Sequence, residues 1–246
     1  MKVAYNDARS IKAIIETLAK LVDEAIFKFK PEGIELEALE RAHIAFIKLS
    51  LPKEMFNEYE IQEEFNFGFN TQYLLKIFKG IKRKEGIIIE SESPELVSLQ
   101  VLGSVNRVYK IKNLDVLPPE IPSFNLEFEV TASITSNGFK KAIQQITSVS
   151  DSVNFSISED ALILRSEGEN KVEVEFSKEN GSLQSIEFTK PVSVSYAGDY
   201  LNDILSLTKL SDYVNVSFSE NKPLQLEFNM EGGGKVNYIQ APKVVQ

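Results

Sequence analysis

The chain contains one sequence pattern twice, and this repeat limits what it can fold into. Residues 13–36 resemble residues 142–164, and residues 70–77 resemble residues 197–204, in the same order and at nearly the same spacing. A repeat of this length predicts two similar domains side by side rather than a solenoid. The 246 residues suit two domains, which we place at 1–113 and 125–246, with a connector at 114–124. The identical pairs include Ala13 and Ala142, Ile14 and Ile143, Asp23 and Asp151, Phe27 and Phe155, Leu36 and Leu164, Tyr73 and Tyr200, Leu74 and Leu201, and Ile77 and Ile204.

Cysteine is absent from the chain. Its absence excludes disulfides, thiolate zinc sites and cysteine nucleophiles, and it suits a reducing or hot cytosol. No apolar run approaches the roughly 18 residues of a membrane span, and residues 1–10 lack the apolar core of a signal peptide. We therefore expect a cytoplasmic protein that binds no membrane.

Hydrophobic periodicity predicts two helices and several strands in each half. The predicted helices cover residues 6–21, 70–84, 136–149 and 197–209. Alternating apolar residues predict strands in the first half at 25–29, 34–36, 43–51, 86–90, 97–102 and 105–111. Runs of strands interrupted by only two helices favour an α+β fold with antiparallel sheets and helices on one face.

Residues 113–125, between the halves, contain three prolines. Proline removes a backbone donor and fixes φ, so this segment is predicted to be extended and outside any central strand. Its apolar residues Leu114, Val116, Leu117 and Ile121 are unusual for a spacer. Either they pack on the two domains, or they help to form a groove for a partner.

The net charge of -9 hides an uneven distribution. The predicted helices hold eleven basic and four acidic residues, whereas the rest of the chain is strongly acidic. If the helices share one face, that face is positive and suits a phosphate backbone held without sequence readout. An ordinary solvated helix face is the alternative for any single lysine, but the run from Lys76 to Lys84 has five basic residues and no acid.

The sequence offers little for catalysis or metal binding. His43 is the single histidine and lies in a predicted strand of alternating apolar residues, where a structural role is more common. Paired acids such as Glu63 and Glu64 are weak signals among 36 acidic residues, and Gly232 to Gly234 is predicted as a turn. We expect no enzyme, no metal site and no cofactor. The alternative to a DNA-binding protein is an acidic scaffold or chaperone that binds proteins.

Over its whole length the chain resembles the archaeal sliding clamps of the proliferating cell nuclear antigen family. The resemblance lies in GIELEALERAHIAFIKLSLP at 33–52, FGFNTQYLLKI at 67–77, LDVLPPEIP at 114–122 and KPLQLEFNMEGGGKVNYIQAPK at 222–243. Among these clamps, FGFNTQYL, LSLTKLSDYV and NMEGGGKV are most similar to the third of three paralogous crenarchaeal subunits. The resemblance implies a processivity factor of the nucleoid: a ring of three two-domain subunits that encircles duplex DNA, with the helices lining the channel.

The resemblance also implies site residues and partners. The partners are duplex DNA, paralogous clamp subunits, DNA polymerase, ligase, flap endonuclease and the clamp loader. Nonspecific phosphate contacts are expected from Lys12, Lys20, Lys76, Lys79, Lys82, Arg83, Lys140, Lys141 and Lys209. Subunits are expected to pair strand 105–112 with strand 171–178 of a neighbour, through Val105, Arg107, Tyr109, Ile111, Lys171, Glu173, Glu175 and Ser177. A partner peptide is expected against Leu39, His43, Ile44, Val116, Pro119, Ile121, Pro122, Pro223, Ile239, Gln240, Ala241 and Pro242.

Overall fold

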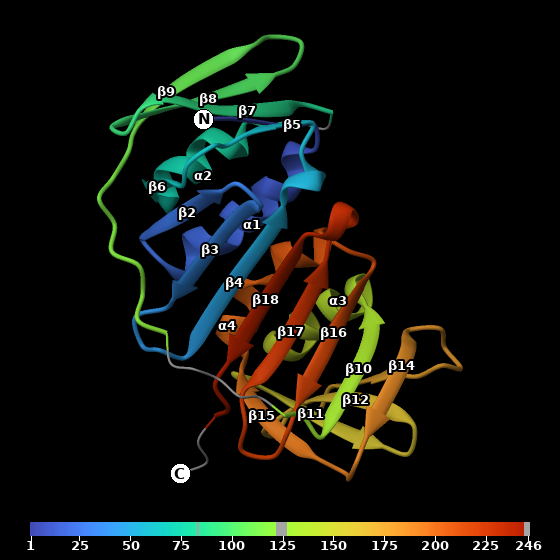
Figure 1. Ribbon diagram of the computed structural model, residues 1–246. Helices are drawn as coiled ribbons and strands as arrows, with labels where there is room; N and C mark the ends of the chain where they lie inside the picture. Colours follow the sequence, from blue (N-terminus) through green and yellow to red (C-terminus); the bar gives the residue numbers. More distant parts are fainter. Residues whose placement is uncertain (83, 122–126, 244–246) are drawn as a thin grey trace. The chain divides into compact units, whose positions relative to one another are not determined.

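The computed structural model describes residues 1–82, 84–121 and 127–243, and the chain divides into two compact units (Figure 1). Each unit includes a short segment from the other half of the sequence, whereas the predicted domains are continuous. The first unit comprises Met1–Arg41, Ile47–Glu120 and Met230–Val236, and the second comprises Ala42–Phe46, Ile121–Asn229 and Asn237–Gln246.

The first unit consists of two antiparallel sheets and two helices. One sheet has the order β5-β1-β7-β8-β9, and the other places β4, β3, β2 and β6 side by side. Its elements are β1 (Lys2–Tyr5), α1 (Ala8–Leu21), β2 (Glu24–Lys30), β3 (Gly33–Leu39), β4 (Ala45–Pro52), β5 (Glu58–Glu60), β6 (Phe65–Asn70), α2 (Thr71–Lys79), β7 (Gly86–Ser93), β8 (Leu96–Leu102) and β9 (Arg107–Lys112).

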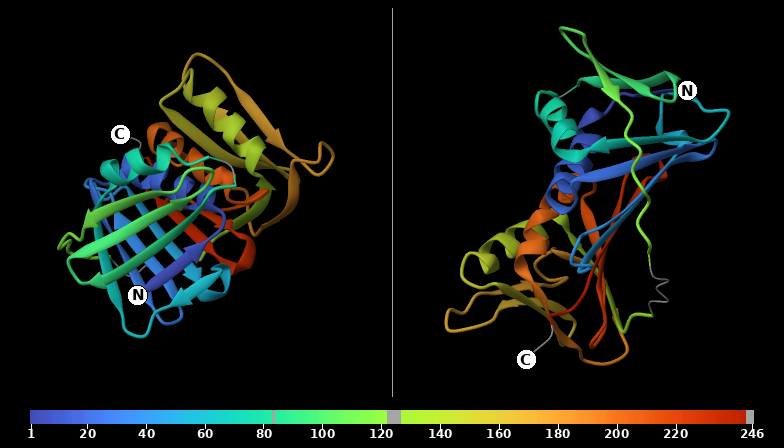
Figure 2. Two further views of the ribbon diagram at one scale, coloured as in Figure 1. Left: turned by 90° about the horizontal axis from the view of Figure 1, so that it is seen from above. Right: turned by 90° about the vertical axis from the view of Figure 1, so that its left-hand side faces the viewer.

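The core of the first unit lies between its sheets and α1. Alternation along β2 turns Phe27 and Phe29 inward, and both border a small internal void with Ile11 of α1 and Ile89 of β7. Burying each such side chain stabilises the fold by roughly 1.5–3 kcal/mol. The right-hand view of Figure 2 shows α1 and α2 on one side of the β2–β3 hairpin and the connector on the opposite side.

The second unit repeats this plan. One sheet has the order β13-β12-β11-β15, and the other places β14, β10, β16, β17 and β18 side by side. Its elements are β10 (Val130–Thr135), α3 (Ser136–Thr147), β11 (Ser152–Ser158), β12 (Ala161–Ser166), β13 (Glu173–Phe176), β14 (Leu183–Phe188), β15 (Ser193–Ala197), α4 (Gly198–Asp203), a 3-10 helix (Leu205–Lys209), β16 (Tyr213–Phe218), β17 (Leu224–Asn229) and β18 (Lys235–Gln240).

The repeated sequence segments form equivalent elements. Residues 13–36 cover the end of α1 and the β2–β3 hairpin, and residues 142–164 cover the end of α3 and the β11–β12 hairpin. The second repeated segment begins α2 in one unit and α4 in the other. The predicted α+β class with antiparallel sheets is therefore confirmed.

Candidate nucleic-acid and partner interfaces

Helix α2 presents its lysines because its apolar residues occupy the opposite face. The helix begins where the side-chain oxygen of Asn70 accepts the N–H of Tyr73 at 2.9 Å. Leu74 and Ile77 are buried, so Lys76 and Lys79 point to solvent on the remaining face. Lys82 and Lys84, in the loop after the helix, are also exposed.

The other predicted phosphate contacts differ in their exposure and in their bonding. Lys20, Lys141 and Lys209 are exposed at or near helix surfaces, and Lys140 is half-buried. Arg83 lies outside the described residues. Lys12 is used differently from the expectation: its ammonium group donates to the carbonyl oxygens of Lys79 at 3.2 Å and Ile81 at 3.4 Å.

Two edge strands lie where the subunit contacts were expected. Strand β9 pairs with β8 on one side, and β13 pairs with β12 on one side. Among the described residues, neither strand has a neighbour on its other edge. Val105 and Val108, beside and within β9, are 69% and 59% exposed. An open edge with exposed apolar side chains is a surface that another strand can extend.

The residues predicted at the subunit interface differ in their position in the strands, in their burial and in their bonding. Strand β9 begins at Arg107 rather than at Val105, and β13 begins at Glu173, so Lys171 precedes the strand. The side chains of Arg107, Tyr109 and Ile111 share the inner face of β9, where Ile111 is buried. In β13 and just after it, Glu173 forms an ion pair with Arg165, Glu175 is exposed, and the N–H of Ser177 donates to Asn180.

The connector begins at a fixed attachment to β6. The side-chain oxygen of Asn113 accepts the N–H of Gly68 at 2.8 Å, and the N–H of Leu114 donates to the Gly68 carbonyl at 2.9 Å. The Asn113 amide nitrogen also donates to the carbonyl oxygens of Asn66 and Pro94. A Cβ at Gly68 would lie 2.1 Å from the Leu114 carbonyl oxygen, so only glycine permits this approach.

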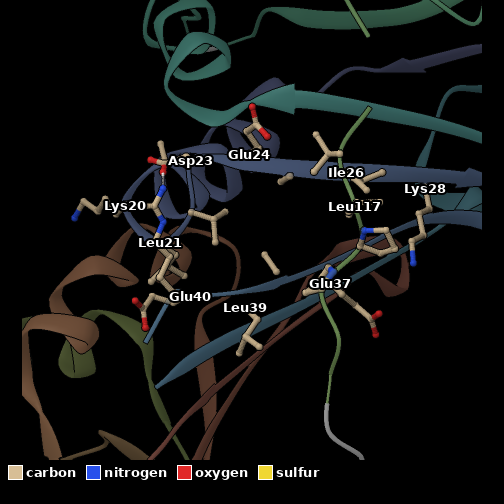
Figure 3. A pocket seen from close by; sticks show the side chains of 18 residues that line it. Lys20, Leu21, Asp23, Glu24, Ile26, Lys28, Glu37, Leu39, Glu40 and Leu117 are labelled. Carbon is tan, nitrogen blue, oxygen red and sulfur yellow. Dashed lines mark hydrogen bonds and ion pairs between the residues drawn. The ribbon is translucent and has the colours of Figure 1, made fainter. Parts of the chain in front are cut away.

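Beyond this attachment, the connector borders a cavity of about 630 Å³ in the first unit. The structure brings three predicted peptide-site residues together there: Leu39 of β3 with Val116 and Pro119 of the connector. Figure 3 shows the side chains around the cavity, with Lys28 and Glu37 on one side and Lys20 and Glu40 on another. The cavity lining combines apolar side chains with a larger polar and charged share, and its apolar part suits an apolar anchor of a peptide.

Several cavity residues are absent from the predicted peptide site, although the apolar connector residues that could form a groove include Leu117. Leu117 is 85% exposed although it is apolar, and Ile26 on the connector side of β2 also lines the cavity. Alternation places Glu24, Ile26 and Lys28 on the same face of β2. This spacing could have identified the three residues, because β2 was predicted and the inward position of Phe27 fixes the outward face.

The remaining peptide-site residues belong to the second unit. There the N–H of Ala241 donates to the carbonyl oxygen of Ile44 at 2.8 Å, and the N–H of Lys243 donates to Ser195 at 2.8 Å. Ile44, Ile121, Pro223, Ile239 and Pro242 are half-buried. Pro122 lies outside the described residues.

Two residues of this set are placed differently from the expectation. Strand β4 starts only at Ala45, so the predicted position of His43 in a strand is wrong. His43 lies in the bend before the strand, where it is exposed and has a φ of 58°. The Gln240 side chain is fully buried and donates to the carbonyl oxygen of Ala197 at 2.9 Å, while its oxygen accepts the Tyr238 hydroxyl at 3.0 Å. Gln240 therefore contributes to the interior of the unit rather than to its surface.

Neither a metal site nor a membrane span is found in the parts of the chain that the structure describes. Across residues 1–82, 84–121 and 127–243, no three His, Cys, Asp or Glu side chains are grouped so that they could hold a metal ion. Within the same ranges, each helix is too short or too polar to cross a bilayer.

The two halves of the chain match two family models. Residues 1–117 match the N-terminal domain of proliferating cell nuclear antigen, and residues 120–243 match its C-terminal domain. The chain is 59% identical over 244 residues to DNA polymerase sliding clamp 1 of Sulfurisphaera ohwakuensis, covering 99% of this chain and 100% of that protein. It is 50% identical to DNA polymerase sliding clamp 1 of Sulfolobus acidocaldarius, with the same coverage.

Solved structures agree with these matches. A structure of proliferating cell nuclear antigen from Thermococcus kodakaraensis superposes with a TM-score of 0.92 at 27% identity, covering 98% of this chain and 99% of that chain. A chain of the PCNA2-PCNA3 complex from Sulfolobus tokodaii shares the fold with a TM-score of 0.94 at 24% identity, covering 99% of both chains. The names of the curated relatives do not confirm the expected likeness to a third subunit. Because both halves match and the relatives are similar over the full length, the chain belongs to the proliferating cell nuclear antigen family of DNA polymerase sliding clamps.

Proposed function

We propose that this chain is one subunit of a three-membered ring that closes around duplex DNA and holds replication enzymes on it. The open edges of β9 and β13 support this proposal most directly. They lie in different units of the chain, so β9 of one subunit can pair with β13 of the next in a head-to-tail ring. Such pairing also covers two edges that would otherwise favour aggregation.

Exposed cations on the helices and in the loop after α2 provide the duplex contacts in this proposal. Lys76, Lys79, Lys82, Lys141 and Lys209 are exposed, and a chain with a net charge of -9 is otherwise poorly suited to DNA. Lysines contact phosphates without reading bases, as a ring that slides along DNA requires. Lys20 and Lys140 belong to the same proposed set, and Lys12 is left out because its ammonium group is bonded to α2.

The cavity beneath the connector provides the partner site. We assign it to an apolar peptide of DNA polymerase, ligase, flap endonuclease or the clamp loader. Leu39, Val116, Leu117 and Pro119 supply the apolar lining, and the Asn113 attachment holds the connector in place over the cavity. Ile121 and Pro242 of the second unit are proposed as further contacts. The chain supplies no chemistry in this scheme and acts as a scaffold.

The ring is proposed to be heteromeric. The relatives in Sulfurisphaera and Sulfolobus are numbered clamps, which suits organisms that have several paralogous subunits. Since a mixed ring needs a different neighbour at each edge, the isolated chain should not form a stable ring.

Assembly and DNA retention test this proposal together. Light scattering of the chain alone, and of equimolar mixtures with its paralogues, should give a trimer only in the mixture. The trimer loaded by the clamp loader should stay on closed circular DNA and slide off after the circle is cut. Equal retention on circular and linear DNA would favour an acidic scaffold that does not encircle DNA. A stable homotrimer that is retained on circles would keep the clamp and overturn the heteromeric ring.

A further inference from the structure

Arg107 connects the edge strand β9 to the loop that follows α2. It is the first residue of β9, and its side chain is on the inner face of the strand. Its guanidinium group donates to the carbonyl oxygen of Gly80 at 3.1 Å and to the carboxylate of Glu85 at 2.7 Å. One side chain therefore contacts both ends of the loop from Gly80 to Glu85.

Glu85 transmits this contact to the backbone of the loop. It is 8% exposed, and one of its carboxylate oxygens accepts both the Arg107 guanidinium and the N–H of Lys82, the latter at 2.7 Å. The Lys82 N–H and, after it, the Arg107 guanidinium lower the pKa of Glu85, so the carboxylate remains charged at neutral pH. A Cβ at Gly103 would lie 2.5 Å from a Glu85 oxygen, so β8 and its following turn also confine this side chain.

The two ends of this connection lie at surfaces with different proposed partners. At one end, Lys82 and Lys84 are exposed cations of the loop. At the other end, the outer edge of β9 is open to another strand. We infer that Arg107 is a positioning residue through which docking of a neighbouring subunit on β9 orders the loop that presents Lys82 and Lys84 to duplex DNA. This inference rests on the proposed clamp function.

The proposed coupling between the two surfaces depends on how freely the backbone of β9 moves. A neighbour that pairs with β9 restricts its backbone motion, and with it the position of the Arg107 guanidinium. The loop held through Gly80 and Glu85 then loses less conformational freedom when it meets a phosphate. Because coupling between two sites is reciprocal, duplex bound at Lys82 and Lys84 also favours the neighbour on β9. Ring closure and contact with DNA strengthen each other through this side chain.

Hydrogen exchange at the loop tests the inference. The exchange rates of the Lys82 and Glu85 amides are measured in the chain alone and after saturation with each paralogous subunit. The paralogue that protects the β9 amides should also slow exchange at Lys82, by about two- to fivefold for a partly exposed ion pair. Arg107→Met should abolish this slowing. Arg107→Lys, which keeps the charge but cannot hold both acceptors, should retain only part of it.

Two further variants test whether the change in exchange at Lys82 depends on the contact between Arg107 and Glu85. Lys110→Met removes the next cation of β9, which is exposed on the outer face, and should leave the slowing at Lys82 intact. Glu85→Gln keeps an acceptor for Lys82 but removes the charge that Arg107 binds, and should reproduce Arg107→Met even if that variant folds poorly. In the assembled ring, Arg107→Met should weaken affinity for a short random-sequence duplex by a similar factor, whereas Lys110→Met should not.

The outcomes separate the inference from the clamp function. Equal slowing at Lys82 in Arg107→Met and wild type, with the paralogue bound equally well, would show that Arg107 does not link the two surfaces. The clamp function would survive that result. If no paralogue protects the β9 amides of the wild-type chain, the proposed subunit interface is wrong, and the inference fails with it.

Discussion

The ammonium group of Lys12 lies 3.2 Å from the carbonyl oxygen of Lys79, at the carboxyl end of α2. It is also 3.4 Å from the carbonyl of Ile81, just after the helix. The last carbonyls of a helix lack partners within the helix and form the negative end of its dipole, so a cation there is stabilising. Lys12 of α1 thereby joins the two helices of the first unit.

Lys12→Met should therefore lower stability rather than duplex affinity. We expect the free energy of unfolding of the chain to fall by about 0.5–1 kcal/mol, the usual value of a cation at a helix terminus. Denaturant unfolding measures this loss. The control, Lys141→Met, removes an exposed lysine from the middle of α3, away from both helix ends, and should change stability by less than about 0.5 kcal/mol. Equal stability of the two variants would mean that Lys12 is an ordinary surface lysine.

Three of the exposed lysines of α2 and its loop should control contact with duplex. Replacing Lys76, Lys79 and Lys82 by Ala should leave the fold intact and reduce polymerase processivity. If each lysine meets one phosphate, the slope of log affinity against log salt should fall by about 0.9 for each residue removed. A control variant without Lys48, Lys53 and Lys190, which lie outside the α-helices and the proposed interfaces, loses the same charge. If both triple variants show the same salt slope, net charge rather than position explains the effect.

Gly68→Ala should move the connector. A methyl group at this position would collide with the Leu114 carbonyl and come within 3.1 Å of a Val116 methyl group. We expect a folded protein whose affinity for a clamp-binding peptide of flap endonuclease falls by about tenfold or more, because anchor sites depend on closely fitted apolar contacts. Calorimetry measures the affinity.

Asn113→Ala, which removes three hydrogen bonds from the same attachment, should act in the same direction. Wild-type affinity in both variants would separate the peptide site from the connector.

The apolar connector residues should contribute directly to peptide binding. Leu117→Ser removes an apolar side chain that is 85% exposed, so it should leave stability unchanged. We expect it to reduce peptide affinity by about 1–3 kcal/mol, as for an interface anchor, and Ile121→Ala and Pro242→Ala to act similarly. Ring assembly serves as the control and should survive each change. The peptide contacts are apolar, so their salt dependence should be weaker than that of duplex binding. Should all three variants bind the peptide normally, the connector residues serve only in packing.

Alkaline pH should destabilise the first unit through Tyr59. Burial, together with the nearby Glu32 carboxylate, raises the pKa of Tyr59 to about 12, and its hydroxyl donates to the Lys30 carbonyl at 2.6 Å. An unfolded tyrosine has a pKa of about 10, so the folded state holds this proton more tightly. The resulting stability is fully present below pH 10 and is lost as the pH rises from about 10 to 12. Unfolding measured across this window should show the loss, and Tyr59→Phe should reduce it. An unchanged pH profile in Tyr59→Phe would assign the loss to other groups.

The sequence by itself determined the features that depend on neighbouring residues. Helices α1 and α2 follow from apolar residues at helical spacing, and the Asn70 cap marks the start of α2. The hairpin of β2 and β3 follows from alternation around the turn at Pro31 and Glu32. The duplication was also visible, because the same local patterns recur in the same order. The three prolines predicted the connector, and the family resemblance predicted which strands would pair between subunits.

Only the tertiary structure decided which of the polar residues are available to partners. Lys12, Arg107 and Gln240 have the residue types expected at a surface, but each is bonded to an atom far away in the sequence. Gly68 looks like an ordinary strand glycine until the connector is seen to lie against it. Periodicity reports which face of an element is apolar, since that depends on residues a few positions apart. It cannot report which distant carbonyl or carboxylate a side chain will meet, because folding alone brings those groups together.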